Sequence, residues 1–155
     1  MSMKDMENAL KLVDENECQA DFEGGKSMSV IEEAQKALSI RFPPTYLVFL
    51  RRLGCGDIAG QEFYGVINGD FHNSCIPDAI WLTLSERENS NLDKNLILVH
   101  ATGIGEYHSI DANQATKDDE YAIVRVALGS KIKPVFVFSD FGEFFFHTIR
   151  SALAN

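Results

Sequence analysis

The segment from residue 40 to residue 65 constrains the fold most strongly, because it begins a helix, ends it and leads into a strand within twenty-six residues. The Pro43-Pro44 pair predicts a helix start, since proline has a φ suited to the first turn and lacks an N–H that this turn would leave unpaired. Gly54 and the glycines that follow predict the end of the helix, and a strand is expected over residues 62–67. The apolar residues of the helix recur at three- and four-residue spacing: Tyr46, Leu47, Phe49, Leu50 and Leu53.

Two further helices are predicted before this segment. Met3, Met6, Leu10 and Val13 mark a short amphipathic helix. The pattern also predicts a helix from Met28 to Ser39, with either Ser27 or Ser29 as its N-cap. Ser29 fits better, because it places Glu32 at the third helical position and completes a capping box.

The second half of the chain reads as strands followed by a helix. Asp78 is the expected N-cap of a helix that carries Ile80, Trp81 and Leu84 on one face. Strands are expected at 96–99, 106–111, 121–126 and 135–138, the first two forming a hairpin, and a closing helix begins at Ser139. Consecutive strands without crossover helices predict an α+β fold: a single domain over residues 1–155, with an antiparallel sheet of about five strands packed with N-terminal and C-terminal helices.

Charge is distributed unevenly along the chain, whose net charge is −9. Residues 1–33 carry three basic and nine acidic groups, and residues 53–120 carry three and twelve, whereas residues 34–52 and 121–155 are net basic. This balance disfavours direct binding to nucleic acid, because the phosphate backbone is repelled. An acidic region is either a solvated surface or a surface that steers basic proteins into docking.

The N-terminal residues and the cysteines bear on localisation. The first ten residues mix charged and apolar side chains, so they predict neither a secretion signal nor a membrane span. Cys18, Cys55 and Cys75 are odd in number and contain no CxxC pair, which favours reduced thiols over disulfides or a zinc site. We therefore expect a cytoplasmic protein that has no metal and no cofactor.

Each candidate for catalysis has a simpler structural explanation. His100 and His108 could lie opposite each other across the predicted hairpin and bind a metal with Asp111, but a shift of one residue in register would separate them, and ordinary hairpin histidines are more common. Cys55 lacks a nearby histidine in the sequence, so packing is favoured over a reactive thiol. The run from Asp118 to Glu120 is interpreted as a solvated turn, and Gly103-Ile104-Gly105 as a hairpin turn. The sequence thus predicts a protein that is not an enzyme.

The motifs resemble those of the SUKH superfamily, specifically its Smi/Knr-like branch, over about residues 27–150. The family pattern is a capped helix with an Ile, a leucine pair leading to proline, Pro-x-x-Tyr-x-x-Phe-Leu, a glycine-rich loop, a glycine turn before a central strand, and a closing Phe-x-Glu-Phe-Leu helix. In this sequence the matching positions are Ile31, Leu38, Pro43/Pro44, Tyr46, Phe49-Leu50, Gly54-Cys55-Gly56, Gly103-Ile104-Gly105 to Ile110-Asp111, and Phe141-Gly142-Glu143-Phe144-Phe145. Gln35, Ser39 and Leu53-Gly54-Cys55 depart from the usual residues.

The resemblance implies an immunity protein, or antitoxin, that neutralises a cognate polymorphic toxin in the bacterial cytoplasm. Many such toxins are nucleases, which must be basic to hold phosphate, so an acidic inhibitor fits. The alternative is a regulatory protein-interaction scaffold of the cell-wall-regulator type, and an enzyme is the third reading. We place the docking surface on the acidic middle region, and its candidate residues are Asp57, Glu62, Tyr64, Trp81, Glu86, Glu106 and Asp111.

Overall fold

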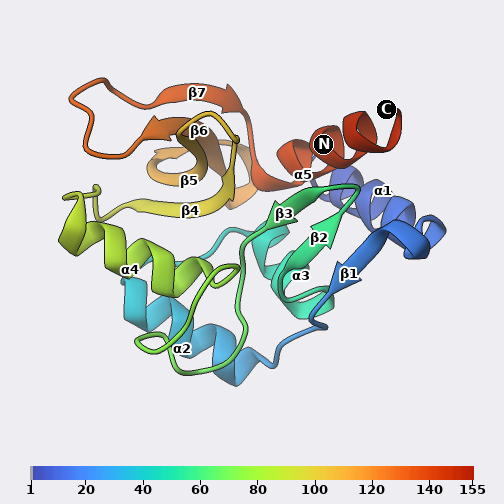
Figure 1. Ribbon diagram of the computed structural model, residues 1–155, viewed down its shortest axis with the longest axis horizontal. Helices are drawn as coiled ribbons and strands as arrows, with labels where there is room; N and C mark the ends of the chain where they lie inside the picture. Colours follow the sequence, from blue (N-terminus) through green and yellow to red (C-terminus); the bar gives the residue numbers. More distant parts are fainter. Residues whose placement is uncertain (1) are drawn as a thin grey trace.

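The computed structural model describes residues 2–155 and contains a seven-stranded antiparallel sheet in the order β1 to β7, with helices packed against it (Figure 1). The helices are α1 (Ser2–Glu15), α2 (Met28–Leu38), α3 (Pro44–Arg52), α4 (Ala79–Asn89) and α5 (Phe141–Leu153), with 3-10 turns η1 (Glu17–Gln19) and η2 (Lys117–Asp119). The strands are β1 (Ala20–Phe22), β2 (Gly56–Ile58), β3 (Gln61–Phe63), β4 (Leu96–Ala101), β5 (Glu106–Ala115), β6 (Tyr121–Ala127) and β7 (Val135–Phe138). None of the helices described is long and apolar enough to cross a membrane.

The α+β class is therefore confirmed, but the sheet is larger than the five strands expected. β1 and β2 are the additional strands, and each spans three residues, too short for alternation to reveal. The predicted strand 62–67 is wrong in its second half: β3 ends at Phe63, and Gly65 makes only an isolated bridge to Asp78.

Helix α3 holds the core together as its sequence predicts. It begins at Pro44 with Pro43 as N-cap, and the rings of Tyr46 and Phe49 are fully buried. The Phe49 ring lies 5.2 Å from that of Phe141 and 5.3 Å from that of Phe145, both edge to face. These contacts join α3 to α5, which also packs along α1 (Figure 1). Helices far apart in sequence thus share one aromatic core.

Two glycines of the region after α3 are required by close backbone approach. A Cβ on Gly65 would lie 1.8 Å from the carbonyl oxygen of Gly54, and a Cβ on Gly25 would lie 1.9 Å from that of Arg51. Any side chain at either position would force the backbone apart. The glycines therefore allow the chain before α2 and the chain after β3 to pack against the end of α3.

Helix caps confirm one prediction and correct another. Asp78 caps α4 by accepting from the backbone N–H groups of Ile80 and Trp81 at 2.9 and 3.0 Å. The N-cap of α2 is Ser27, which accepts from the N–H of Val30 at 3.3 Å, and not Ser29. Ser29 lies inside the first turn because the helix begins earlier than the capping-box pattern suggests.

The strands give the sheet two unlike faces. Phe63 is opposite His100, His100 is opposite His108, and His108 is opposite Arg125, so these residues form one row on one face. Phe144 of α5 packs against this row, with its ring 5.9 Å from Phe63 and 4.9 Å from His108. Residues next in sequence to this row, such as Glu62, point to the other face.

Candidate functional site

Three carboxylates stand side by side on the face of β1–β3 that is opposite to α3 and α5. Asp21 on β1 is directly across from Asp57 on β2, and Asp57 is directly across from Glu62 on β3. Directly opposed side chains share a face and have Cβ atoms about 5 Å apart. We call Asp21, Asp57 and Glu62 the carboxylate ladder. Figure 1 shows its three strands in front of α3, with no helix over their near side.

No cation within residues 2–155 forms an ion pair with the ladder. The ion pairs of the structure join Lys26 to Glu23, Lys36 to Glu33 and Arg125 to Glu106. Partial burial, and after it the charge of Asp57, raises the pKa of Glu62. Like charges opposed on neighbouring strands destabilise a sheet, so the ladder lowers the stability of the fold and creates a strong local negative potential.

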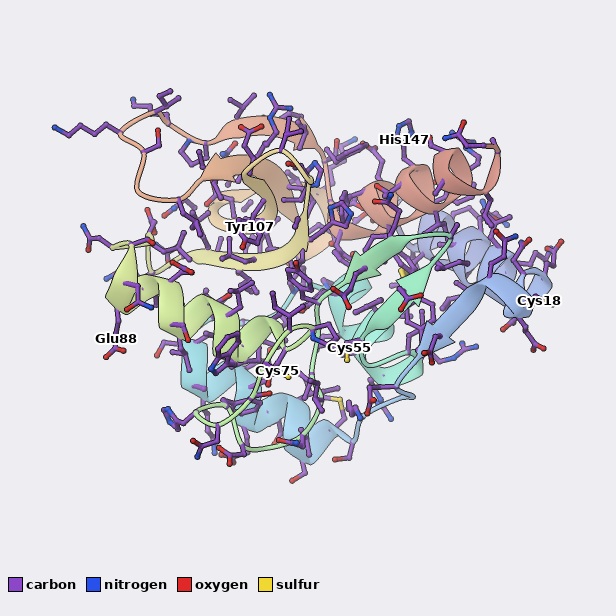
Figure 2. The ribbon with its side chains drawn as sticks, in the orientation of Figure 1. Cys18, Cys55, Cys75, Glu88, Tyr107 and His147 are labelled. Atoms are coloured by element: carbon purple, nitrogen blue, oxygen red, sulfur yellow. The ribbon has the colours of Figure 1, made fainter. Side chains whose placement is uncertain are left out.

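Two tyrosines adjoin the ladder. Tyr64 follows Glu62 by two residues, and burial, with smaller effects of Tyr107 and Glu62, raises its pKa to about 12. Tyr64 is almost fully buried, whereas Tyr107 on β5 is half-buried. Figure 2 shows Tyr107 on the β4–β5 part of the sheet, above α4. Tyr107 is therefore better placed than Tyr64 to contact a partner.

The structure does not bring Glu106 and Asp111 to the ladder. Glu106 lies two residues before His108, on the face covered by α5, and its carboxylate is 3.4 Å from Arg125. Asp111 is 4% exposed and accepts hydrogen bonds from the Asn113 backbone N–H and the Gln114 side-chain amide. Glu106 therefore forms an ion pair on the α5 face and Asp111 is buried at the bulge in β5, so both lie outside the ladder.

Helix α4 carries the remaining two predicted residues away from the ladder. Trp81 is half-buried beside Phe71 and Arg87, and Glu86 accepts a hydrogen bond from Ser90 one turn later. The face that this helix buries consists of Ala79, Ile80, Leu82 and Thr83, so the predicted apolar face of Ile80, Trp81 and Leu84 was only partly right. The ladder thus retains Asp57, Glu62 and Tyr64 from the predicted set.

The two histidines of the β4–β5 hairpin do lie opposite each other. Their Nδ1 atoms are 3.0 Å apart, and the His100 Nε2 is 2.8 Å from Gln61 Oε1. Burial, followed by the charge of His108, lowers the pKa of His100 to about 4, and burial also lowers that of His108. Asp111 lies three residues beyond His108 and faces the other way, so it does not join them. Within residues 2–155 no three side chains that bind metals come together.

The sequence predicted the burial of Cys55 correctly and that of Glu120 wrongly. Cys55 is buried as expected, and burial raises its pKa to about 12, which suppresses the reactive thiolate. Glu120 was expected in a solvated turn but is 1% exposed, and its two carboxylate oxygens accept from the backbone N–H and hydroxyl of Thr45 at 2.9 and 2.8 Å. The Thr45 hydroxyl also accepts from the N–H of Gly142. Glu120 therefore connects the first turns of α3 and α5.

Sequence reasoning missed Asp21, Tyr107 and Glu120. Asp21 was counted only in the acidic region of residues 1–33, and recognising β1 would have placed it beside Asp57. Tyr107 was assigned to the correct strand, but only the register between strands shows that it adjoins Tyr64. Glu120 has no sequence signal, because its partner Thr45 is seventy-five residues away.

Comparison with protein families agrees with this architecture. The SUKH_5 family model, described as SMI1-KNR4 cell-wall, matches residues 6–149. The chain therefore belongs to the SUKH family of SMI1-KNR4 proteins. Comparison with curated proteins returned no match.

Proposed function

We propose that this protein is an immunity protein that binds a cognate toxin in the bacterial cytoplasm and blocks it without catalysis. The carboxylate ladder is the docking surface, with Asp21, Asp57 and Glu62 as its charged centre and Tyr107 as its aromatic border. The observation that carries the proposal is the register of three like charges on an uncovered face of the sheet.

The energetics of the ladder support a protein partner. Within the chain, the opposed carboxylates repel one another and destabilise the fold. A cationic partner surface would be attracted to all of them and would offset this repulsion. Electrostatic attraction also raises the association rate, which matters for an inhibitor that must reach a toxin before its target does. A basic nuclease domain fits this surface, because the residues that hold phosphate would be covered by the ladder.

The chemistry of the other polar clusters supports a binding role. The His100–His108 pair is neutral at physiological pH and covered by Phe144, and the Cys55 thiol is buried. A general base or nucleophile needs contact with a substrate, which none of these groups offers.

The test uses the protein encoded by the neighbouring gene as the candidate toxin. We expect co-expression with this chain to restore growth of a bacterial host, and the purified pair to associate more slowly as salt increases. The variant Asp57→Asn/Glu62→Gln should lose protection and most of the salt dependence, whereas the control Glu32→Gln/Glu33→Gln on α2 should retain both. Protection that survives in the ladder variant would move the docking surface elsewhere.

A second candidate function is a regulatory scaffold that acts through protein contacts, and the description of the matching family favours it. The ladder would then bind a basic segment of a host protein. Affinity purification from the native organism separates the two functions: recovery of a toxic gene product supports immunity, and recovery of proteins of cell-wall synthesis supports regulation. Both outcomes depend on the same surface, so the ladder variant is the control in each.

A further inference from the structure

The free edge of the sheet at β7 is a second surface with the properties of a binding site. The strand order ends at β7, which within residues 2–155 pairs with β6 alone. Val135 and Phe136 are 46% and 52% exposed, and Ile132 in the preceding loop is 80% exposed. An unpaired strand edge bordered by exposed apolar side chains is the arrangement to which an extended peptide adds as a further strand.

The charge around this edge is opposite to that of the chain as a whole. Residues 121–139 contain Arg125, Lys131 and Lys133 and no Asp or Glu. Arg125 is paired with Glu106, whereas Lys131 and Lys133 are exposed and, within the described residues, have no carboxylate at ion-pair distance. At physiological salt, charges act over about 8 Å, so an occupant of the edge experiences these lysines more than the distant acidic ladder.

We propose that the β7 edge binds an extended acidic segment of a partner protein. The segment lies along Val135–Phe138, its backbone completes the unpaired edge, its apolar side chains cover Phe136 on one face of the sheet, and its carboxylates meet Lys131 and Lys133. A second copy of the chain fits less well, because joining two β7 edges would bring the lysines of both copies together. This inference goes beyond the proposed function, since it concerns the opposite edge of the sheet and the opposite charge.

The test is a binding titration with a short fluorescein-labelled peptide that alternates aspartate and valine, compared with a peptide of equal length that alternates lysine and valine. In the ladder variant Asp57→Asn/Glu62→Gln, in which binding of the basic peptide at the ladder is weakened, the acidic peptide should bind more tightly than the basic one. Lys131→Glu/Lys133→Glu should weaken this binding by at least about tenfold and improve binding of the basic peptide. The control Lys4→Glu/Lys11→Glu makes the same change of charge on α1 and should leave both affinities unchanged.

Hydrogen exchange provides the second measurement. The acidic peptide should slow exchange of the backbone amides of residues 135–138, and Phe136→Asp should abolish binding while retaining the denaturation midpoint of the parent. Unchanged affinity for the acidic peptide in the Lys131→Glu/Lys133→Glu variant would overturn the proposal. Concentration-dependent dimerisation that Phe136→Asp removes would overturn it as well, in favour of a second copy.

The ladder variant Asp57→Asn/Glu62→Gln separates this inference from the proposed function. It should bind the acidic peptide as the parent does. A loss of peptide binding in this variant would show that the peptide does not occupy the β7 edge.

Discussion

At β3 the two faces of the sheet place neighbouring side chains in opposite environments. Glu62 and Phe63 are neighbours on β3, yet Glu62 joins a row of exposed carboxylates and Phe63 joins a row in which α5 covers two histidines. On the uncovered face, water solvates the charges, so repulsion is tolerated. On the covered face, burial favours the neutral form of His100 by lowering its pKa. The difference teaches that helix coverage, and not strand sequence, decides which polar residues remain charged and available to a partner.

The largest expected effect comes from removing the ring that secures the covered face. Phe49→Ala should lower the free energy of unfolding by about 3–5 kcal/mol, because Phe49 is fully buried against Phe141 and Phe145. Denaturant titration measures this loss, and Phe136→Ala on exposed β7 is the matched control, expected to change stability little. Equal effects of the two substitutions would show that the covered core has been misassigned.

The next effect is a dependence of stability on pH that Glu120 causes. Burial raises the pKa of Glu120 to about 7 from its usual 4.5. Its contribution to the free energy of unfolding is therefore complete below pH 4.5 and is lost as pH rises through 7. The loss amounts to up to about 3 kcal/mol. Glu120→Gln should remove this fall between pH 4.5 and 7, as seen in urea midpoints at several pH values. An unchanged profile would place Glu120 in a solvated, ionised state.

His100 should act in the opposite direction over a similar range. Its pKa is lowered to about 4 from 6.5, so its contribution is present above pH 6.5 and is lost as pH falls through 4, by about 1–3 kcal/mol. The two groups partly compensate in the parent protein. The variant His100→Phe retains only the effect of Glu120, so it should become more stable as pH falls from 7 to 4.5. The variant Glu120→Gln retains only the effect of His100, so it should become less stable as pH falls from 6.5 to 4. Parallel profiles for the two variants would contradict this assignment.

The smallest effect concerns the uncovered face. Asp57→Asn removes the central charge of the ladder and should raise the free energy of unfolding by about 0.2–1 kcal/mol at low salt. The gain should disappear at 1 M salt, where the screening length is about 3 Å. Glu86→Gln on α4, outside the ladder, serves as the control. A loss of stability in Asp57→Asn would mean that the carboxylates are not in mutual repulsion.

Several parts of the fold follow from local sequence alone. The start of α3 at the prolines, the cap Asp78 and the β4–β5 hairpin depend on residues close together in the chain, so pattern and turn chemistry predicted them. Ser29 was chosen over Ser27 because both satisfy local rules for an N-cap, and only packing of α2 decides between them. The α+β class was predictable because strands follow one another without crossover helices.

The candidate site was predicted only in part, because a sheet face is made by pairing across the chain. The sequence by itself determined that the middle of the chain is acidic, that Asp57 lies in the glycine-rich loop after the helix, and that Glu62 lies at the start of the next strand. Only the tertiary structure decided that Asp21 joins them, that Glu106 faces the other side, and that Asp111 and Glu120 are buried. The physical reason is that the charge of a carboxylate is a property of its residue, whereas its exposure and its neighbours depend on register and on which helix covers that face.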